Sequence, residues 1–336
     1  MEVFAPGRVN LIGDHTDHQG GLVLPIAIDL GTTIVGAPSG DRVRFRSGDE
    51  EGIVDMRLGG SSPPAGGPEW GRYIAAIVEL VRPTEGFVGT ISTTLPLGRG
   101  LSSSAALEVS VTLALGFDGS PVELARLCQR SEYLAVGVSC GIMDQLASAA
   151  GVADHALLID CHETSVTPVP MPESVDVLVV DSGERRSLTK TAYNERLAEC
   201  ARAAEVVGPL RFLPDVAGIG DPVVRRRARH VVTEIGRVGA FVDALRAGDN
   251  QGAGALMVES HESLRTDFEV STPRLDALVE DLLVAPGIYG ARLTGAGFGG
   301  SVVALAARGA PLPRGAIRVR ASTGARVTAG RTGPLP

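Results

Sequence analysis

The sequence predicts an α+β fold arranged in two domains. In the first half of the chain, strand-like and helix-like segments are mixed without the regular alternation of a parallel α/β protein. The second half is mostly helical and ends in strand-like segments. A length of 336 residues exceeds what one hydrophobic core usually supports. We place the boundary in the proline-rich stretch 167–172, so the expected domains span 1–172 and 173–336.

The first domain is expected to place several strands before its first helix. The segment 23–35 is rich in β-branched residues, and 43–46 alternates between apolar and arginine side chains, as in a half-exposed strand. In the segment 70–81, apolar residues recur at the spacing of one helical face. The remaining elements predicted for this domain are a strand at 86–95 and helices at 107–115, 122–136 and 146–150.

The second domain opens on the apolar run 175–180, which is typical of a buried strand. Two strand-like segments near its end, 289–294 and 301–305, flank a glycine-rich loop and are expected to pair. A last strand is expected at 316–320, followed by a polar tail after Ala321. Between the first and the later strands, helical periodicity predicts helices at 191–207, 223–247, 252–264 and 273–283.

Composition and charge exclude several classes of function. Hydrophobic residues make up 44% of the chain, the net charge is −8, and the one run of three arginines, 225–227, falls in a helical segment. Nucleic-acid-binding domains are usually basic, so we expect no nucleic-acid partner. Lys190 is the only lysine and no GxxxxGK[ST] motif occurs, which excludes a P-loop nucleotide site. Any phosphate contact must come from backbone N–H groups, arginines, hydroxyls or a metal ion.

The cysteines match no zinc finger or ribbon, and four of them in a chain of this length make no disulfide framework. Each lies among apolar residues and is expected to be a buried, reduced thiol. The sequence begins without a signal-peptide pattern, and no apolar run reaches the roughly 18 residues of a membrane span. We therefore expect a soluble, cytoplasmic protein without a membrane partner. The cysteines are Cys128, Cys140, Cys161 and Cys200.

One glycine- and serine-rich run has the features of a phosphate site. It leads directly into a helical segment, so its serines stand where the first N–H groups of a helix lack partners. The glycines remove side-chain bulk, the helix dipole attracts an anion, and the hydroxyls could hold a metal ion. A serine cap after a glycine turn is the simpler alternative. The candidate ATP-binding residues of this run are Pro96, Gly98, Arg99, Gly100, Leu101, Ser102, Ser103, Ser104 and Ala105.

Two further glycine-rich stretches, 5–18 and 293–301, lie near the two ends of the chain. Glycine at this density is costly unless the backbone must turn sharply or approach a ligand. The three stretches, in this order, resemble the three motifs of the GHMP small-molecule kinases, and the first is similar to the galactokinase signature in particular. The resemblance covers nearly the whole chain up to about Leu305, with further galactokinase-like segments at 140–145, 155–161, 192–196 and 259–270.

The resemblance implies an N-terminal domain like ribosomal protein S5 domain 2, a ferredoxin-like C-terminal domain, and an active site in the cleft between them. It implies an enzyme that uses ATP and Mg²⁺ to phosphorylate galactose at the anomeric hydroxyl. A kinase for N-acetylgalactosamine, galacturonate or arabinose is the alternative within the same fold. A non-catalytic sensor of galactose and ATP is the alternative from another class, but Arg8, Asp144 and the intact phosphate run argue against it.

Asp144 and Arg8 are the candidate catalytic residues. Asp144 stands in a mostly apolar stretch, 140–151, where a carboxylate is either a helix cap or a functional charge that needs a partner. Arg8, in the first glycine-rich stretch, is the expected partner. The resemblance implies that Asp144 accepts or orients the proton of the sugar hydroxyl, while Arg8 offsets the charge of the transferring phosphoryl group.

The candidate metal ligands are Ser104 and Glu132. Mg²⁺ prefers one or two protein oxygens in addition to phosphates and waters. Both residues match the family's positions for these ligands. On the sequence pattern alone, Glu132 could equally be a surface residue of its helix.

The expected sugar site gathers polar residues from several segments. A polar turn and, less favoured, a zinc site are the alternatives for the Asp/His cluster of the first stretch. From the third stretch, Gly295 and Gly297 are expected to lie against the phosphates or the sugar. A tight hairpin is the simpler interpretation of this loop and is compatible with that role, and Phe298 is expected to be a core anchor. The candidate sugar ligands are Asp14, His15, Asp17, Gly141, Asp144 and Tyr193.

The sequence departs from the family pattern at three places. Asp14 stands where the family usually has glutamate, and His18 where it usually has tyrosine, so sugar discrimination is expected to be looser. Only ten residues, mostly glycine, alanine and proline, separate Leu305 from Ala316, where the family usually has a helix. We expect one helix fewer in the second domain, and a homodimer through this shortened region would cover the exposed sheet.

Overall fold

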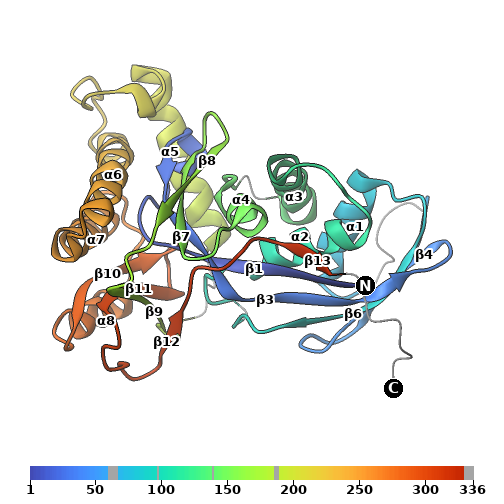
Figure 1. Ribbon diagram of the computed structural model, residues 1–336. Helices are drawn as coiled ribbons and strands as arrows, with labels where there is room; N and C mark the ends of the chain where they lie inside the picture. The colour runs from blue at the N-terminus through green and yellow to red at the C-terminus, as the bar shows by residue number, and fades with distance from the viewer. Residues whose placement is uncertain (60–66, 97, 138–139, 185–188, 329–336) are drawn as a thin grey trace.

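The computed structural model describes residues 1–59, 67–96, 98–137, 140–184 and 189–328 (Figure 1). Within these ranges the chain forms three sheets, with most of its helices packed around them. The α+β class predicted from the mixed elements is therefore confirmed.

A six-stranded sheet forms the framework of the first domain. Its order is β13-β1-β3-β6-β4-β5, and every neighbouring pair is antiparallel except β4 and β6. The strands are β1 (Glu2–Asn10), β3 (Pro25–Pro38), β4 (Arg42–Ser47), β5 (Ile53–Arg57), β6 (Phe87–Thr93) and β13 (Arg326–Thr328), and the helices are α1 (Gly71–Val81), α2 (Ser103–Ala114), α3 (Pro121–Val136) and α4 (Met143–Ala150). In Figure 1 helices cover one face of this sheet; α2 and α4 pack directly against β1 and β3, and α3 packs against α1, α2 and α4.

The register of α3 is fixed by its ends. Ser120 and Glu123 form a capping box, and Pro121 occupies the first helical position, where its missing N–H is not needed. Gly137 ends the helix in the left-handed conformation, which costs glycine little. This register turns Glu132 toward the start of α2, where the Ser104 hydroxyl lies 3.3 Å away.

A four-stranded sheet of order β10-β11-β9-β12 forms the framework of the second domain. The central strands β9 and β11 are buried almost throughout, as their largely apolar sequences predict, although β9 also contains Asp176. The long helix α6 is capped by Asp221 and ends at left-handed Gly248. The elements are β9 (Val175–Asp181), α5 (Thr189–Val207), α6 (Pro222–Ala247), α7 (Asn250–Thr266), α8 (Pro273–Leu283), β10 (Ile288–Thr294), β11 (Ser301–Ala307) and β12 (Ala316–Val319).

The two halves of the chain share a hydrophobic core. One cluster joins Leu11 and Ile26, from the first motif and β3, to Val177 and Val303 of the second sheet and to Phe241 of α6. A small third sheet, of order β2-β7-β8, joins this core through Ala156 and Val169. Its Leu157 and Ile159 pack instead against α3 and α4. Its strands are β2 (Leu22–Val23), β7 (His155–Asp160) and β8 (Ser165–Pro170).

Three details differ from the sequence-based expectations. Helix α4 begins at Met143, one turn before the predicted 146, because Asp144 and Gln145 interrupt the apolar pattern but belong to the helix. The polar tail beyond Ala321, for which the sequence pattern predicts no strand, contributes β13, which pairs with β1. The segment 308–315 holds no helix, yet β9 and β11 are covered by the chain itself, so the expected open sheet face is wrong for these strands.

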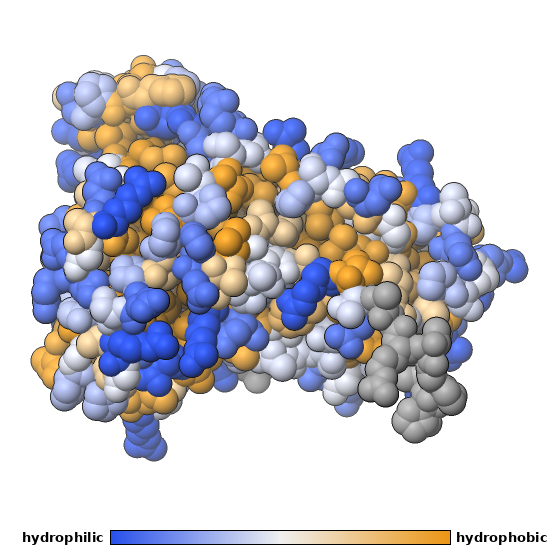
Figure 2. Space-filling model, in the orientation of Figure 1, coloured by the Kyte–Doolittle hydropathy of each residue, from blue (hydrophilic) through white to orange (hydrophobic). Residues whose placement is uncertain are grey.

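The surface in Figure 2 shows apolar side chains in separate groups bordered by polar ones. In the described ranges, none of the helices combines the length and the apolar character required to cross a bilayer.

Candidate active site

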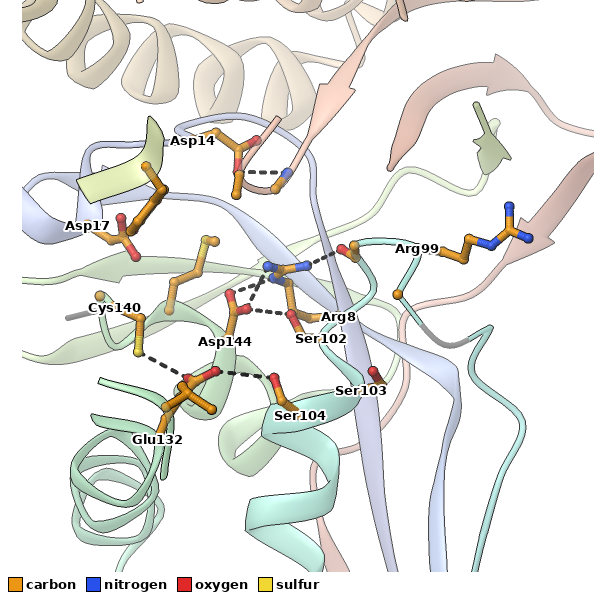
Figure 3. A pocket seen from close by; sticks show the side chains of 18 of the residues that line it. Arg8, Asp14, Asp17, Arg99, Ser102, Ser103, Ser104, Glu132, Cys140 and Asp144 are labelled. Carbon is orange, nitrogen blue, oxygen red and sulfur yellow. Dashed lines mark hydrogen bonds and ion pairs between the residues drawn. The ribbon is translucent and has the colours of Figure 1, made fainter. Parts of the chain in front are cut away.

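A cavity of about 820 Å³ opens where β1, the N-terminal ends of α2 and α4, and the loop before β11 meet. Figure 3 shows the Arg8–Asp144 pair between two groups, with Asp14 and Asp17 on one side and Ser104 and Glu132 on the other. The sequence-predicted residues in its wall are Arg8, Asp14, His15, Asp17, Gly98, Arg99, Gly100, Ser102, Ser103, Ser104, Glu132, Gly141, Asp144, Tyr193 and Gly295.

Arg8 and Asp144 form a bidentate ion pair, as the sequence predicts. Arg8 Nε donates to Asp144 Oδ1 at 2.8 Å and Nη2 donates to Oδ2 at 2.7 Å. The third nitrogen, Nη1, donates to the carbonyl of Gly100 at 2.7 Å. Asp144 lies in the first turn of α4, where a helix dipole favours a negative charge. The guanidinium thus joins the carboxylate to the loop that precedes α2.

Ser102 links the same carboxylate to the start of α2. Its hydroxyl donates to Asp144 Oδ2, although this serine is the N-cap residue, whose side chain usually bonds its own helix. Ser102 has a φ of 58°, a left-handed conformation that is uncommon for residues other than glycine. This strained turn directs the hydroxyl to Asp144 and leaves the first N–H groups of α2 free of a side-chain cap.

The loop before α2 has the shape expected of a phosphate site. Gly98 and Gly100 have φ values of 73° and 82°, so each occupies a conformation that suits glycine. Ser103 and Ser104 follow in the first turn of α2, where backbone N–H groups attract anions. Arg99 adds a positive charge to the cavity wall and is ion-paired with Asp181 of β9.

Glu132 lies at the end of the cavity beside Ser104. Ser104 donates to Glu132 Oε1, whereas Cys140 and Gln145 donate to Oε2 at 3.1 and 2.6 Å. Burial raises the pKa of Glu132, and burial together with the charge of Glu132 raises the pKa of Glu108 well above its usual value. The site therefore presents two closely spaced oxygens to a ligand, backed by a buried polar network.

Asp17 is a partly buried acid of the predicted sugar side. It lines the cavity from the turn η1 (Asp17–Gln19), and Oδ1 accepts from the backbone N–H of His18 at 3.0 Å. A Cβ at Gly141 would lie only 1.8 Å from Asp17 Oδ2, so this glycine is required by the close approach. Burial, then the charge of Asp144, raises the pKa of Asp17 to about 7.

Asp14 differs from the simple expectation of a carboxylate turned toward a sugar. It is 1% exposed, and its oxygens face Arg292 Nη2 at 2.7 Å and the N–H of Gly295 at 3.1 Å. Arg292, itself buried, donates to the carbonyl of Leu11 at 3.2 Å. Although Asp14 borders the cavity, its carboxylate contacts Arg292 and Gly295 and so connects the first glycine-rich stretch to the third.

Three imidazoles surround the ring of Phe268, at centroid distances of 4.5 Å for His15, 6.5 Å for His18 and 4.7 Å for His230. Burial lowers the pKa of His18 to about 3 and that of His230 to about 4, so both rings are neutral near pH 7. His18 is not part of the cavity wall in the described chain, and it stands behind His15 and Tyr193.

Sequence reasoning and the cavity wall differ at several positions. Pro96, Leu101, Ala105 and Gly297 are described residues that lie outside the wall; Leu101 and Ala105 are buried in the core, and Gly297 packs against Val270. Phe298 packs against the hydrophobic cluster of the second sheet that includes Leu293 and Val302, as predicted. The unpredicted wall residues are of two kinds. Cys140, Met143 and Ala296 lie inside segments that the sequence analysis singled out, next to Gly141, Asp144 and Gly295. No local signal marks the others, which lie outside the motifs: Glu50, Tyr73, Val136 and Glu184.

Three family models match the chain in the order of its glycine-rich stretches. The galactokinase galactose-binding signature matches residues 1–38. The GHMP kinases N terminal domain matches 72–152, and the GHMP kinases C terminal model matches 241–318. These matches confirm the resemblance inferred from the motifs.

Relatives match over almost the whole chain. Galactokinases of Homo sapiens and Bos taurus are each 43% identical to it over 327 residues, which cover 91% of this chain and 83% of the relative. The structure of Lactococcus lactis galactokinase complexed with galactose is 31% identical and has a TM-score of 0.89, covering 97% of this chain and 94% of that one. Methanococcus jannaschii mevalonate kinase, at 21% identity and a TM-score of 0.70, shares the fold.

These matches run through the residues that build the cavity. The galactose-binding signature contains Arg8, Asp14 and Asp17. The N-terminal domain model contains Asp144 and the loop 98–102 before α2, which we call the phosphate loop for its predicted role. The chain belongs to the galactokinase family of the GHMP kinases.

Proposed function

We propose that the protein transfers the γ-phosphoryl group of ATP to the anomeric hydroxyl of galactose, giving α-D-galactose 1-phosphate and ADP. The observation that carries this proposal is the Arg8–Asp144 pair, which lies between a phosphate-binding helix end and a polar sugar side. The galactose-binding signature over 1–38 supports galactose over the alternative sugars.

Asp144 is the group placed to orient or accept the sugar proton. A carboxylate offers about four lone-pair positions. Arg8 and Ser102 take three of them, one on Oδ1 and two on Oδ2. The remaining position on Oδ1 is available to a hydroxyl, and the Asp144 side chain is 30% exposed to the cavity.

Arg8 contacts both the carboxylate that would receive the sugar proton and the loop that would hold the phosphates. Its fork fixes the carboxylate, and its charge lies beside the carbonyl of Gly100 in the phosphate loop. Phosphoryl transfer depends mainly on positioning and on charge stabilisation, so a buried guanidinium between nucleophile and phosphate supplies both.

Ser104 and Glu132 fit a magnesium ion that also binds the phosphates. Their oxygens are 3.3 Å apart beside the N-terminus of α2. In the described residues no group of three or more His, Cys, Asp or Glu side chains is arranged to hold a metal ion, so the protein supplies few ligands. Mg²⁺ commonly binds this way, with phosphates and waters completing its shell, and it would neutralise charge on the transferring group.

Incubation with ATP, galactose and Mg²⁺ is expected to give a phosphomonoester on the anomeric carbon. Phosphorus NMR with its coupling to the anomeric proton distinguishes this product from a 6-phosphate. Chelation of the metal should abolish turnover and added Mg²⁺ should restore it. A 6-phosphate, or no product with galactose, would overturn the proposal, and turnover of only another sugar would favour the alternative kinases.

The kcat/KM for galactose is expected to rise with pH up to about 7 and then level off. Asp17 is favoured in its protonated form in the free protein below about 7, and only the carboxylate accepts two sugar hydroxyls well. The raised pKa also means that Asp17 stabilises the free fold at low pH, below the ordinary value of 3.8, and that this contribution is lost as the pH rises through about 7. In Asp17→Asn the rise of kcat/KM with pH should disappear. An unchanged profile would show that Asp17 is not the group whose ionisation causes this rise.

Sugar discrimination is expected to be looser than in relatives that carry glutamate and tyrosine at these positions. The Asp14 carboxylate is held by Arg292 and Gly295, and His18 stands outside the cavity wall. Galactose analogues altered at C2 or C6 should be turned over measurably. Glutamate is one methylene longer than aspartate, so at position 14 it would carry the carboxylate from Arg292 toward the cavity that Asp14 borders. The variant Asp14→Glu with His18→Tyr should therefore lower the KM for galactose and suppress the analogues. An unchanged ratio of kcat/KM values would show that these positions do not set selectivity.

We also propose that the protein acts in the cytoplasm and forms a homodimer through the shortened region. The four cysteines are free, which suits a reducing compartment. Leu312 and Ile317, in and beside this region, are 51% and 38% exposed. Sedimentation equilibrium of the wild type and of Leu312→Asp with Ile317→Asp tests the dimer, which only the wild type should form.

A further inference from the structure

A buried amide lies behind the two oxygens that fit a metal ion. Gln145 is 0% exposed, and its Nε2 donates to Glu132 Oε2 at 2.6 Å and to Glu108 Oε2 at 3.3 Å. Glu108 is also fully buried, on α2. Within the described residues, Gln145 is the only side chain that donates to both carboxylates.

The two carboxylate oxygens of Glu132 have different partners. Oε2 accepts from Gln145 and from Cys140, so the lone pairs of this oxygen are used within the protein. Oε1 has only the long contact of 3.3 Å from the Ser104 hydroxyl, which a cation could replace at little cost. The oxygen next to the phosphate loop is therefore the one left for a ligand.

The same contacts tie three helices together around the site. Ser104 and Glu108 are four residues apart on α2, so they lie on one face of that helix. Gln145 follows Asp144 in the first turn of α4, and Glu132 belongs to α3. The amide thus fixes the metal-side carboxylate relative to the helix turn that carries Asp144.

We propose that Gln145 is a positioning residue that orients the carboxylate of Glu132 toward a nucleotide-bound Mg²⁺. This inference rests on the proposed function, because it names the residue that orients a ligand of the magnesium ion used in that reaction. Partners that hold a metal ligand in place commonly change metal affinity by roughly ten- to a hundredfold when they are removed. Gln145 should have an effect of this size without touching sugar or nucleotide.

The test is metal binding to Gln145→Met, which keeps the length of the side chain but removes both donors. Titration of the enzyme–ADP complex with Mn²⁺, followed by the EPR signal of free Mn²⁺, should show an affinity at least about tenfold lower than in the wild type. Galactose affinity, measured by calorimetry without nucleotide, should not change. Gln129→Met is the matched control, because Gln129 donates to the carbonyl of Cys140 at 2.9 Å and to neither carboxylate. This control should bind Mn²⁺ as the wild type does.

Two outcomes would overturn the inference: wild-type Mn²⁺ affinity in Gln145→Met, or an equal loss in Gln129→Met. Since Gln145 acts through Glu132, the change should have no further effect in a Glu132→Gln background. If Gln145→Met does not fold, Gln145→Asn keeps the amide on a shorter stem and should show the same loss. Absence of Mn²⁺ binding by the wild-type complex would instead contradict the proposed function.

Discussion

Replacement of Asp144 by asparagine is expected to lower kcat for galactose by at least about a hundredfold, the usual scale of a positioned base. Asparagine keeps the shape of the side chain but has only one acceptor oxygen. Arg8 has no acceptor, and it donates to both oxygens of Asp144. The amide nitrogen of asparagine must therefore face a donor, which breaks one arm of the fork and removes the charge.

The KM for ATP should change little in Asp144→Asn, because the carboxylate bonds Arg8 and Ser102 and lies at the sugar side of the phosphate loop. Steady-state kinetics with varied ATP and varied galactose separate these effects. Asp55→Asn is a suitable control, since Asp55 pairs with Arg42 at the surface and is not among the residues that line the cavity. Turnover near the wild-type level in Asp144→Asn would show that another group carries the step.

Arg8→Ala is expected to lower kcat as strongly and also to destabilise the fold. Arg8 is 5% exposed, and its removal leaves the carbonyl of Gly100 without its side-chain donor and Asp144 with only the donor Ser102. Loss of one partner from a fully buried pair costs about 3–5 kcal/mol, and the cost here should be smaller because Asp144 is 30% exposed. Thermal denaturation and turnover should both report the change.

Arg8→Lys separates charge from geometry at this position. Lysine keeps the charge but cannot form the fork with Asp144, so stability should recover more than kcat does. Arg57→Ala, which removes an exposed ion pair with Asp41, should alter neither quantity measurably. Full activity in Arg8→Lys would show that the fork is not needed for catalysis.

The sequence predicted best what depends on local pattern. The helices of the second half fall close to their predicted bounds, and α8 spans Pro273–Leu283 as predicted, because Thr272 and Pro273 mark its start. The glycine loops and the Arg8–Asp144 pair were predicted because their chemistry is concentrated in short motifs.

The sequence could not predict contacts that depend on tertiary geometry. Nothing local indicates that Asp14 would turn to Arg292, which lies far away in the chain on β10. Ser102 was expected to serve the phosphates, whereas its left-handed backbone turns the hydroxyl to Asp144. The wall residue Tyr73 is absent from the prediction for the same reason, since only the packing of α1 beside α3 brings it to the cavity.

The pairing of β13 with β1 constrains how the chain can fold during synthesis. Val3 pairs with Val327, so the first sheet is completed only when almost the whole chain has left the ribosome. Until β13 has been synthesised, one edge of β1 stays unpaired, and contacts between residues so far apart in the sequence form slowly. Translation pauses or C-terminal truncation would therefore harm the N-terminal half, which is made first, and the nascent chain has a stretch of exposed strand edge for chaperones to protect.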